Sequence, residues 1–240
     1  MSAQDHDRVA DDRAGPGWAA VVMAVAAKDL RIEFRTRART LTMAGFVVMV
    51  GLLFFFSVDR ALVRPQDIAS GLTWITLILA GLIGVGRTFE IEKADGAMTG
   101  LLLTPAPRDA IYLGKVLANF ILVYAIVLLT TAVFGLFFQL DYSNHPGALL
   151  LLLAAGTLGF VALATLFGAL TAETTLGESL LPILLFPLLV PMVIYGAAAS
   201  SRLLLGRPLS EVEGQVRMLA AFALLAVSVG AVLFGQIVEE

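Results

Sequence analysis

Residues that could bind haem iron or a metal are few in this chain of 240 residues and stand far apart. The two histidines are His6, near the start, and His145, in a short polar segment. A histidine can ligate haem iron, but the Asn-His-Pro sequence around His145 is typical of an exposed turn. Met43, Met49 and Met192 could act as soft ligands, although methionine in an apolar helix usually serves packing. We therefore expect no metal site and no directly bound cofactor.

The chain also lacks the groups needed for several kinds of catalysis. It contains no cysteine, which excludes disulfides, thiolate nucleophiles, iron–sulfur clusters and covalent haem attachment. It has no G-x-x-x-x-G-K-[ST] sequence, so it cannot hold nucleotide phosphates in a P-loop. If ATP is used, a different protein of the complex must bind it.

Composition places the chain in a membrane. Hydrophobic residues make up 59% of the chain and charged residues 15%, and the mean hydropathy is +0.90. Soluble domains contain about 45–50% apolar and about 25% charged residues. The excess apolar surface requires lipid, and we predict an all-α integral membrane protein.

Six apolar stretches have roughly the ~20 residues that a helix needs to cross a ~30 Å hydrocarbon core. As drawn from the sequence, none contains Asp, Glu, Lys, Arg or His. An ion-coupled transporter would normally need such a group at depth, so secondary transport and acid–base catalysis inside the membrane are not expected. The stretches are residues 41–58, 68–86, 116–138, 147–171, 180–199 and 218–238.

Two segments precede the first span. Residues 1–17 are polar and end in Gly-Pro-Gly, which predicts a loose cytosolic tail, and they are not expected to be a cleavable signal peptide. Residues 18–40 have helical periodicity, with Met23, Ala27, Leu30 and Phe34 on one face.

The other side of the 18–40 helix is basic, which favours a helix lying in the headgroup region with this side towards phosphates. The alternative is a cytosolic extension of the first span. The basic residues are Lys28, Arg31, Arg35 and Arg39.

Lys and Arg residues outside the spans predict the orientation. With the N-terminus inside, the cytosolic side holds eleven of them and the outer side five. We therefore expect a multi-pass protein with both termini in the cytosol. The 200–217 loop carries three of the five and argues mildly the other way.

Residues 87–115 form the longest loop between spans, within a permease domain of residues 41–240. Glycines and prolines at fixed places predict a helix–turn–helix hairpin that re-enters a helix around Asp109 and continues into the third span. Three consecutive leucines should be covered by a partner or the membrane surface. We expect a docking segment, with a loop folded back on its own helix ends as the alternative. Its candidate residues are Glu90, Glu92, Asp95, Gly96, Leu101, Leu102, Leu103, Pro105, Pro107, Arg108, Gly114 and Lys115.

The fifth span contains Pro182, Pro187 and Pro191, each of which removes an amide donor. We expect a kinked or locally unwound helix that faces protein rather than lipid, because freed carbonyls need partners in a membrane. The bend could be a hinge for transport or a fixed feature of packing.

The sequence resembles the ABC-2-type (type V exporter-like) permeases, in which an interfacial helix precedes six spans and the loop between the second and third spans contacts the ATPase. The resemblance rests on Glu90-x-Glu92-x-x-Asp95-Gly96, Leu101-Leu102-Leu103-x-Pro105-x-Pro107 and Leu113-Gly114-Lys115.

Within these permeases the chain resembles the CcmB family, the permease component of the cytochrome c maturation haem-export system. One departure is the loop of residues 172–179, which carries Glu173 and Glu178 but no basic residue. The matching segments are Lys28-Asp29-Leu30-Arg31-x-Glu33-x-Arg35-x-Arg37, Ala80-Gly81-Leu82, Arg87-x-Phe89, Ile111-Tyr112-Leu113-Gly114-Lys115 and Glu178-x-Leu180-Leu181-Pro182-Ile183-Leu184-Leu185-x-Pro187-Leu188-x-Val190-Pro191.

The resemblance implies a non-catalytic subunit of the bacterial inner membrane, with ATP bound by a CcmA-like ATPase and haem as a candidate cargo. It also implies CcmC-like and CcmD-like membrane partners, a CcmE-like haem chaperone, and no nucleic acid. Trp18 and Trp74 are the only tryptophans, so the tryptophan-rich haem-handling motif of a sister protein in that system is missing. The alternatives are a general ABC-2 exporter of drugs or polysaccharide and a non-transporting scaffold.

Overall fold

The computed structural model describes residues 17–59, 63–94, 107–172 and 177–237, which form helices and no strand. Six of the described helices, all except α2, are long and apolar enough to cross a membrane, which confirms the predicted fold class. The elements are α2 (Trp18–Thr36), α3 (Ala38–Ser57), α4 (Pro65–Ala94), α6 (Arg108–Phe138), α7 (Pro146–Ala172), α8 (Gly177–Leu204), the 3-10 turn η1 (Leu209–Glu211) and α9 (Glu213–Ile237).

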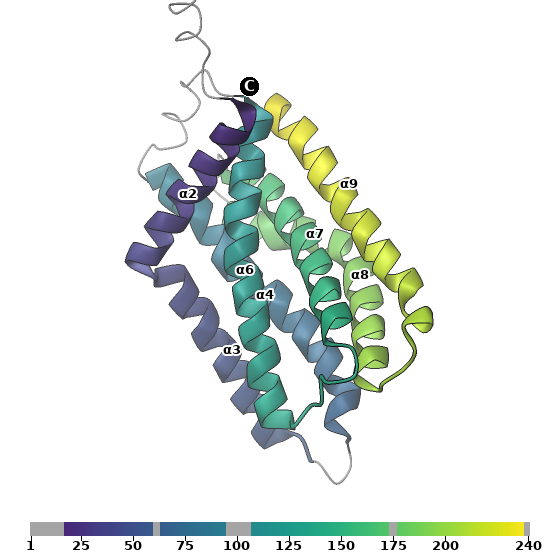
Figure 1. Cartoon of the computed structure of the whole chain (residues 1–240). Coiled ribbons are helices and arrows are strands. Elements are labelled where there is room, and N and C mark those ends of the chain that lie inside the picture. Colours follow the sequence, from purple (N-terminus) through teal and green to yellow (C-terminus); the bar gives the residue numbers. More distant parts are fainter. Residues whose placement is uncertain (1–16, 60–62, 95–106, 173–176, 238–240) are drawn as a thin grey trace, which may run out of the picture.

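Helix α7 lies at the centre of the bundle and packs against α4, α6, α8 and α9. Helix α3 lies at one edge, where it packs mainly on α4 and α6, and α9 lies at the opposite edge (Figure 1). The start of α2 and the end of α9 lie at the same end of the bundle, next to the beginning of α6. We call this end the α2 end.

Helices α4 and α6 are longer than a membrane requires. They contain 30 and 31 residues, or about 45 Å each at a rise of 1.5 Å per residue, whereas ~20 residues span the hydrocarbon core. The candidate span of α4 ends at Gly86, whereas that of α6 begins at Arg108, its first residue. Helix α4 therefore extends beyond its candidate span at the α2 end.

The third span begins as a helix ahead of its apolar stretch. We expected the chain to re-enter a helix around Asp109 that becomes the third span, and α6 begins at Arg108 and continues without a break to Phe138. Pro107 stands immediately before the first turn and Asp109 within it, and both are favourable at a helix N-terminus. These two signals place the helix start ahead of the apolar stretch, which begins at residue 116.

Trp74 joins three helices in the interior. Its side chain is fully buried on α4, and its Nε1 donates a hydrogen bond to Ser200 Oγ on α8 at 3.0 Å. The indole fills the space left by two glycines, Gly156 on α7 and Gly196 on α8, where an added Cβ atom would overlap it. Small residues that let helices approach are typical of packing in membranes.

Tyr112 makes a similar contact nearer the α2 end. Its hydroxyl donates to the carbonyl of Ala162 on α7 at 2.9 Å, and an added Cβ at Gly230 on α9 would overlap it. The ring also packs against Phe234 of α9 at 5.5 Å between centroids. Tyr112 thus fixes α6 against both α7 and α9.

We predict that Gly156→Ala and Gly196→Ala each destabilise the protein, because the buried indole of Trp74 has no room to move. Overpacking of this kind costs about 1–3 kcal/mol, which thermal unfolding of the purified protein in detergent would detect. Gly45→Ala on α3 is the control, since its added Cβ meets nothing within 4 Å. Equal losses of stability in all three variants would contradict the role assigned to Trp74.

Candidate functional site

Helix α2 ends earlier than the sequence predicted. We expected one helix over residues 18–40, but α2 stops at Thr36 and α3 starts at Ala38. Arg37, between them, adopts a left-handed conformation with φ 55°, which is uncommon for a residue other than glycine. Its amide donates to the carbonyl of Glu33 at 2.6 Å, so the last turn of α2 is closed before the chain changes direction.

One face of α2 packs along the beginning of α6. Val21, Val25, Asp29 and Glu33 follow one another at intervals of four and are all buried, which places them on one face. The two backbones approach closely at Gly114, where an added Cβ would lie 2.7 Å from Val25 Cβ and 2.8 Å from the Val22 carbonyl oxygen. The predicted loop residue Gly114 is therefore a contact point between two helices.

The apolar face predicted for α2 points away from the protein. Met23 is 61% exposed and Phe34 is 67% exposed. Arg31 and Arg35 are exposed on a separate side, and Lys28 is partly exposed. Helix α2 thus has three faces, of which one packs on protein, one is apolar and one is basic. This division is compatible with the predicted position in the headgroup region, which stays a prediction.

Arg39 does not belong to the basic side of α2, and its prediction as a phosphate-facing residue is wrong. It lies in the first turn of α3, beyond the break at Arg37, and its side chain is 7% exposed. Its Nε donates to Glu33 Oε2 at 2.8 Å. The change of direction at Arg37 rotates Arg39 from the side of Arg35 to the interior.

Lys115 is also buried, against the prediction of a loop cation. Its side chain is fully buried, and its Nζ lies 3.7 Å from Asp29 Oδ2. Lys28 Nζ lies 3.0 Å from Oδ1 of the same carboxylate. Because α6 begins at Arg108, Lys115 lies inside the helix and beneath α2 rather than in solvent. A buried cation requires such a partner.

Glu33 connects α2 to the first turn of α3. Besides the bond from Arg39, its Oε1 accepts hydrogen bonds from the backbone amide of Thr40 at 2.8 Å and from the Thr40 hydroxyl at 2.7 Å. The carboxylate therefore caps α3, and its charge is favourable at a helix N-terminus. Burial alone would raise the pKa of Glu33, but the hydrogen bonds from Arg39 and Thr40 outweigh it and lower the pKa.

Polar contacts continue from Arg39 into the bundle. Arg39 Nη1 donates to Asn119 Oδ1 on α6 at 3.4 Å, and Asn119 Nδ2 donates to Thr165 Oγ1 on α7 at 3.3 Å. All three side chains are buried. We call Asp29, Glu33, Arg39, Lys115, Asn119 and Thr165 the junction cluster, since together they link α2, α3, α6 and α7.

We did not predict Asp29, Glu33, Asn119 or Thr165 as site residues from the sequence. A signal was present, because Asp29 and Glu33 stand four apart and so do Lys115 and Asn119. Residues four apart share a face of a helix. The acidic row of Asp29 and Glu33 could therefore have been matched with the row of Lys115 and Asn119 in the later segment.

The structure describes only part of the predicted docking loop. Pro107 is the residue before α6 and Arg108 its first residue, and Arg108 Nη1 is buried without a hydrogen-bond partner among the described residues. Glu90 and Glu92 lie on the last turns of α4, where only the backbone is described. Outside the described residues lie Asp95, Gly96, Leu101, Leu102, Leu103 and Pro105.

The loop of residues 172–179 is described only at its edges. Glu173 lies outside the described residues, and Glu178 lies in the first turn of α8, where only the backbone is described.

The proline-rich helix α8 is not packed as expected. It continues as helix through all three prolines, so local unwinding is not observed, and its predicted kink stays a prediction. Pro187 and Pro191 are exposed, whereas Leu185 and Leu189 are buried against the bundle. Within this chain, the side of α8 that carries Pro187 and Pro191 faces outward rather than towards protein.

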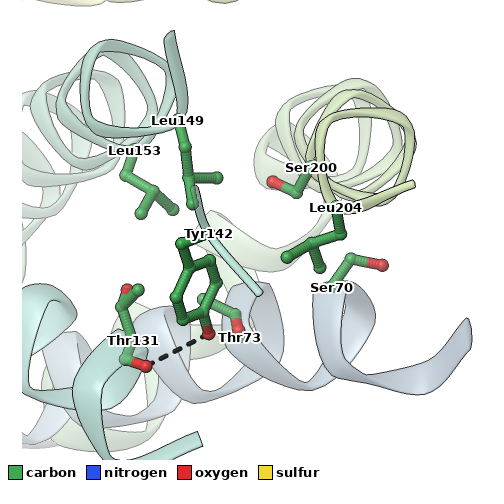
Figure 2. A pocket seen from close by; sticks show the side chains of 8 residues that line it. All are labelled: Ser70, Thr73, Thr131, Tyr142, Leu149, Leu153, Ser200 and Leu204. Carbon is green, nitrogen blue, oxygen red and sulfur yellow. Dashed lines mark hydrogen bonds between the residues drawn. The ribbon is translucent and has the colours of Figure 1, made fainter. Parts of the chain in front are cut away.

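A small pocket lies at the end of the bundle opposite α2 (Figure 2). Its empty space is about 250 Å³, part of it open to the surroundings, which is below the ~300–1,000 Å³ of ordinary ligand sites. This pocket is too small for haem. Its lining residues are Ser70, Thr73, Thr131, Tyr142, Leu149, Leu153, Ser200 and Leu204.

Tyr142 occupies one side of this pocket, and its hydroxyl donates to the carbonyl of Thr131 at 3.1 Å. Burial raises the pKa of Tyr142 to about 12, so it remains a neutral donor.

In the polar segment next to Tyr142, the side chain and amide of Ser143 donate to Asp141 and lower the pKa of that carboxyl. His145 is half-buried, and its carbonyl accepts a bond from Leu149 in the first turn of α7. Among the described residues, no group of three His, Asp or Glu side chains could hold a metal ion.

Comparisons with known proteins agree with the resemblance seen in the sequence. A family model described as CcmB protein matches residues 20–239. The chain is 31% identical over 202 residues to heme exporter protein B of Pseudomonas aeruginosa, covering 84% of this chain and 89% of that protein. It is 28% identical over 203 residues to heme exporter protein B of Bradyrhizobium diazoefficiens, covering 85% and 90%. With heme exporter protein B of Escherichia coli (strain K12) the identity is 31% over 194 residues, covering 80% and 86%.

We predict that Glu33→Gln lowers the free energy of unfolding by about 1–3 kcal/mol at neutral pH, because charged hydrogen bonds to Arg39 and Thr40 are weakened. The pKa of Glu33 is lower in the folded protein than its ordinary 4.5. The stabilisation is therefore complete above that value and is lost as pH falls through the folded pKa. Thermal unfolding of both proteins should show a constant difference down to about pH 4.5 and a smaller one below.

The control for this prediction is Glu213→Gln on α9. Its carboxylate pairs with Arg217 at 2.8 Å, but the two side chains are 59% and 79% exposed. Exposed pairs contribute little, so this variant should remain close to the wild type. An equal effect of both substitutions would contradict a special role for Glu33.

Proposed function

The chain belongs to the CcmB protein family, and on that premise we propose that it is the permease subunit of an ABC transporter for haem export in cytochrome c maturation. The observation that carries the proposal is the family match along residues 20–239, since these residues include nearly all of α2 and all six span helices. The similar proteins from three bacteria bear the name heme exporter protein B.

The energy source belongs to a separate protein in this proposal. The chain has no P-loop sequence, and a CcmA-like ATPase would bind and hydrolyse ATP. This chain is then non-catalytic, resides in the bacterial inner membrane, and has both termini in the cytosol. The start of α2 and the end of α9 lie at one end of the bundle, in keeping with an even number of spans.

The ATPase would dock at the α2 end, on the segment of residues 87–115. Two features support this position. Helices α4 and α6 are both about ten residues longer than a membrane span needs, and the segment between them contains the apolar run Leu101-Leu102-Leu103. An apolar centre within a charged rim is typical of a protein interface.

Movement rather than conduction is the favoured role of the bundle. The pocket opposite α2 is too small for haem, whereas the α2 end contains helices tied together by buried charge. A displacement at the start of α6 would pass through the bundle to CcmC-like and CcmD-like membrane proteins and promote release of a haem-loaded CcmE-like chaperone. Haem is a candidate cargo of the whole complex, and no cofactor is assigned to this chain.

We predict that Glu92→Lys and Asp95→Lys weaken binding of the ATPase, because they reverse charge on the proposed docking segment. Co-purification from membranes should fall by about tenfold, which corresponds to about 1.4 kcal/mol. Asp67→Lys is a matched control, since Asp67 is exposed in the first turn of α4 at the opposite end. Undisturbed binding in both charge-reversed variants would count against this segment as the docking site.

The function itself is tested by complementation. In a strain that lacks its own CcmB protein, expression of this chain together with its ATPase should restore holocytochrome c, measured by haem staining and absorbance. No restoration despite correct insertion and ATPase binding would favour a general ABC-2 exporter. An ATPase rate that is unchanged by reconstitution with this chain would favour a scaffold.

A further inference from the structure

Two acids on α2 take their cationic partners from two different spans. Asp29 faces Lys115 of α6, and Glu33 binds Arg39 of α3. The two acids are four residues apart, so both point to the same side of α2. Helix α2 therefore lies over the start of α3 and the start of α6, with one ion pair to each.

All four of these side chains are buried. Their exposed fractions are 8% for Asp29, 0% for Lys115, 3% for Glu33 and 7% for Arg39. Separation of either pair would take a buried cation away from its carboxylate, Lys115 from Asp29 or Arg39 from Glu33, which is strongly unfavourable. A row of apolar residues could slip along a neighbouring helix by one turn, whereas a charged pair fixes one register.

Other contacts extend the attachment along α6. Trp18 Nε1 donates to Asp109 Oδ2 at 2.8 Å, and Val21 and Val25 pack in one cluster with Ala110. The opposite side of α2 makes few contacts with the described part of the chain. Its side chains Met23 and Phe34 are largely exposed. The protein contacts of α2 are thus concentrated on α6 and the first turn of α3.

We propose that Asp29, Glu33, Arg39 and Lys115 are positioning residues that join α2, α3 and the first half of α6 into one rigid unit. A displacement of the start of α6 then moves α3 as well, although α3 lies at the edge of the bundle. The role of this unit in coupling to the ATPase rests on the proposed function. The rigid unit itself can be tested without a partner.

The test uses pairs of spin labels, which is practical because the chain contains no cysteine. Cysteines at Phe34 and Leu136 measure the distance between α2 and α6, and cysteines at Phe34 and Val232 measure the distance between α2 and α9. The three side chains are 67%, 77% and 67% exposed. Distances would be measured in the full-length protein in lipid nanodiscs.

The first comparison needs no ATPase. In the double variant Asp29→Leu with Lys115→Leu, the buried cation and its carboxylate are removed together. Lys28 also loses its contact with Asp29, but its side chain is 39% exposed, so the protein should still fold. We expect the α2–α6 distance distribution to broaden, and we expect the charge swap Asp29→Lys with Lys115→Asp to restore a narrow distribution. Arg31→Leu, on an exposed part of α2, should leave it unchanged. A narrow distribution in the double variant would overturn the proposal.

The second comparison adds the ATPase with and without nucleotide. In the wild type the α2–α6 distance should stay constant while the α2–α9 distance changes. A shift of the α2–α6 distance would overturn the rigid unit. If no distance changes with nucleotide, the proposed coupling to the ATPase fails, whereas the first comparison still decides the attachment of α2.

A functional readout separates positioning from folding. The double variant Asp29→Leu with Lys115→Leu should give normal amounts of folded protein and normal ATPase binding, but about tenfold less holocytochrome c per ATP hydrolysed, a typical coupling effect. The charge swap should recover most of this loss. A normal yield in the double variant would show that the ion pair serves only folding and would overturn the positioning role.

Discussion

A buried charge needs a partner, and in this protein that requirement determines where α2 can lie. Glu33 satisfies the Arg39 guanidinium and the first turn of α3 at once, and Asp29 satisfies the fully buried Lys115. These demands fix the register of α2 on two other helices. They also account for the left-handed Arg37, because α3 must turn back sharply enough to bring Arg39 and Thr40 to the Glu33 carboxylate.

The interior of the bundle follows a different rule. Lipid is as apolar as leucine, so helices in a membrane associate through close packing and hydrogen bonds rather than through burial from water. Trp74 and Tyr112 show both contributions. Trp74 lies against two glycines of neighbouring helices and Tyr112 against one, and the polar atom of each side chain has a hydrogen-bond partner. Helix α7 supplies a glycine to Trp74 and a carbonyl to Tyr112, which explains its central position.

Hydropathy alone was sufficient to predict six spans, because a long apolar stretch has few other stable locations. The faces of α2 were harder to predict. Periodicity correctly grouped Met23, Ala27, Leu30 and Phe34, but an apolar face in a membrane protein can point to lipid as readily as to protein. The inward face contains two acids, which can be buried only because Lys115 and Arg39 pair with them. Lys115 is distant in the sequence, and Arg39 lies beyond the change of direction at Arg37. Charge counting placed these cations in solvent because it does not include the packing of α2 on α6.

The two ends of the bundle differ in a way that bears on transport. At one end, two sets of buried polar contacts link four helices: Asp29 with Lys115, and Glu33 through Arg39 and Asn119 to Thr165. At the other, Tyr142 closes one side of a small pocket with a bond to a backbone carbonyl. Closely packed helices transmit displacement because their interior has little free volume to absorb it. Helix α6, which begins directly after residues 95–106, belongs to this linked set. The arrangement is therefore better suited to receive a movement at that end than to admit a haem-sized molecule at the other.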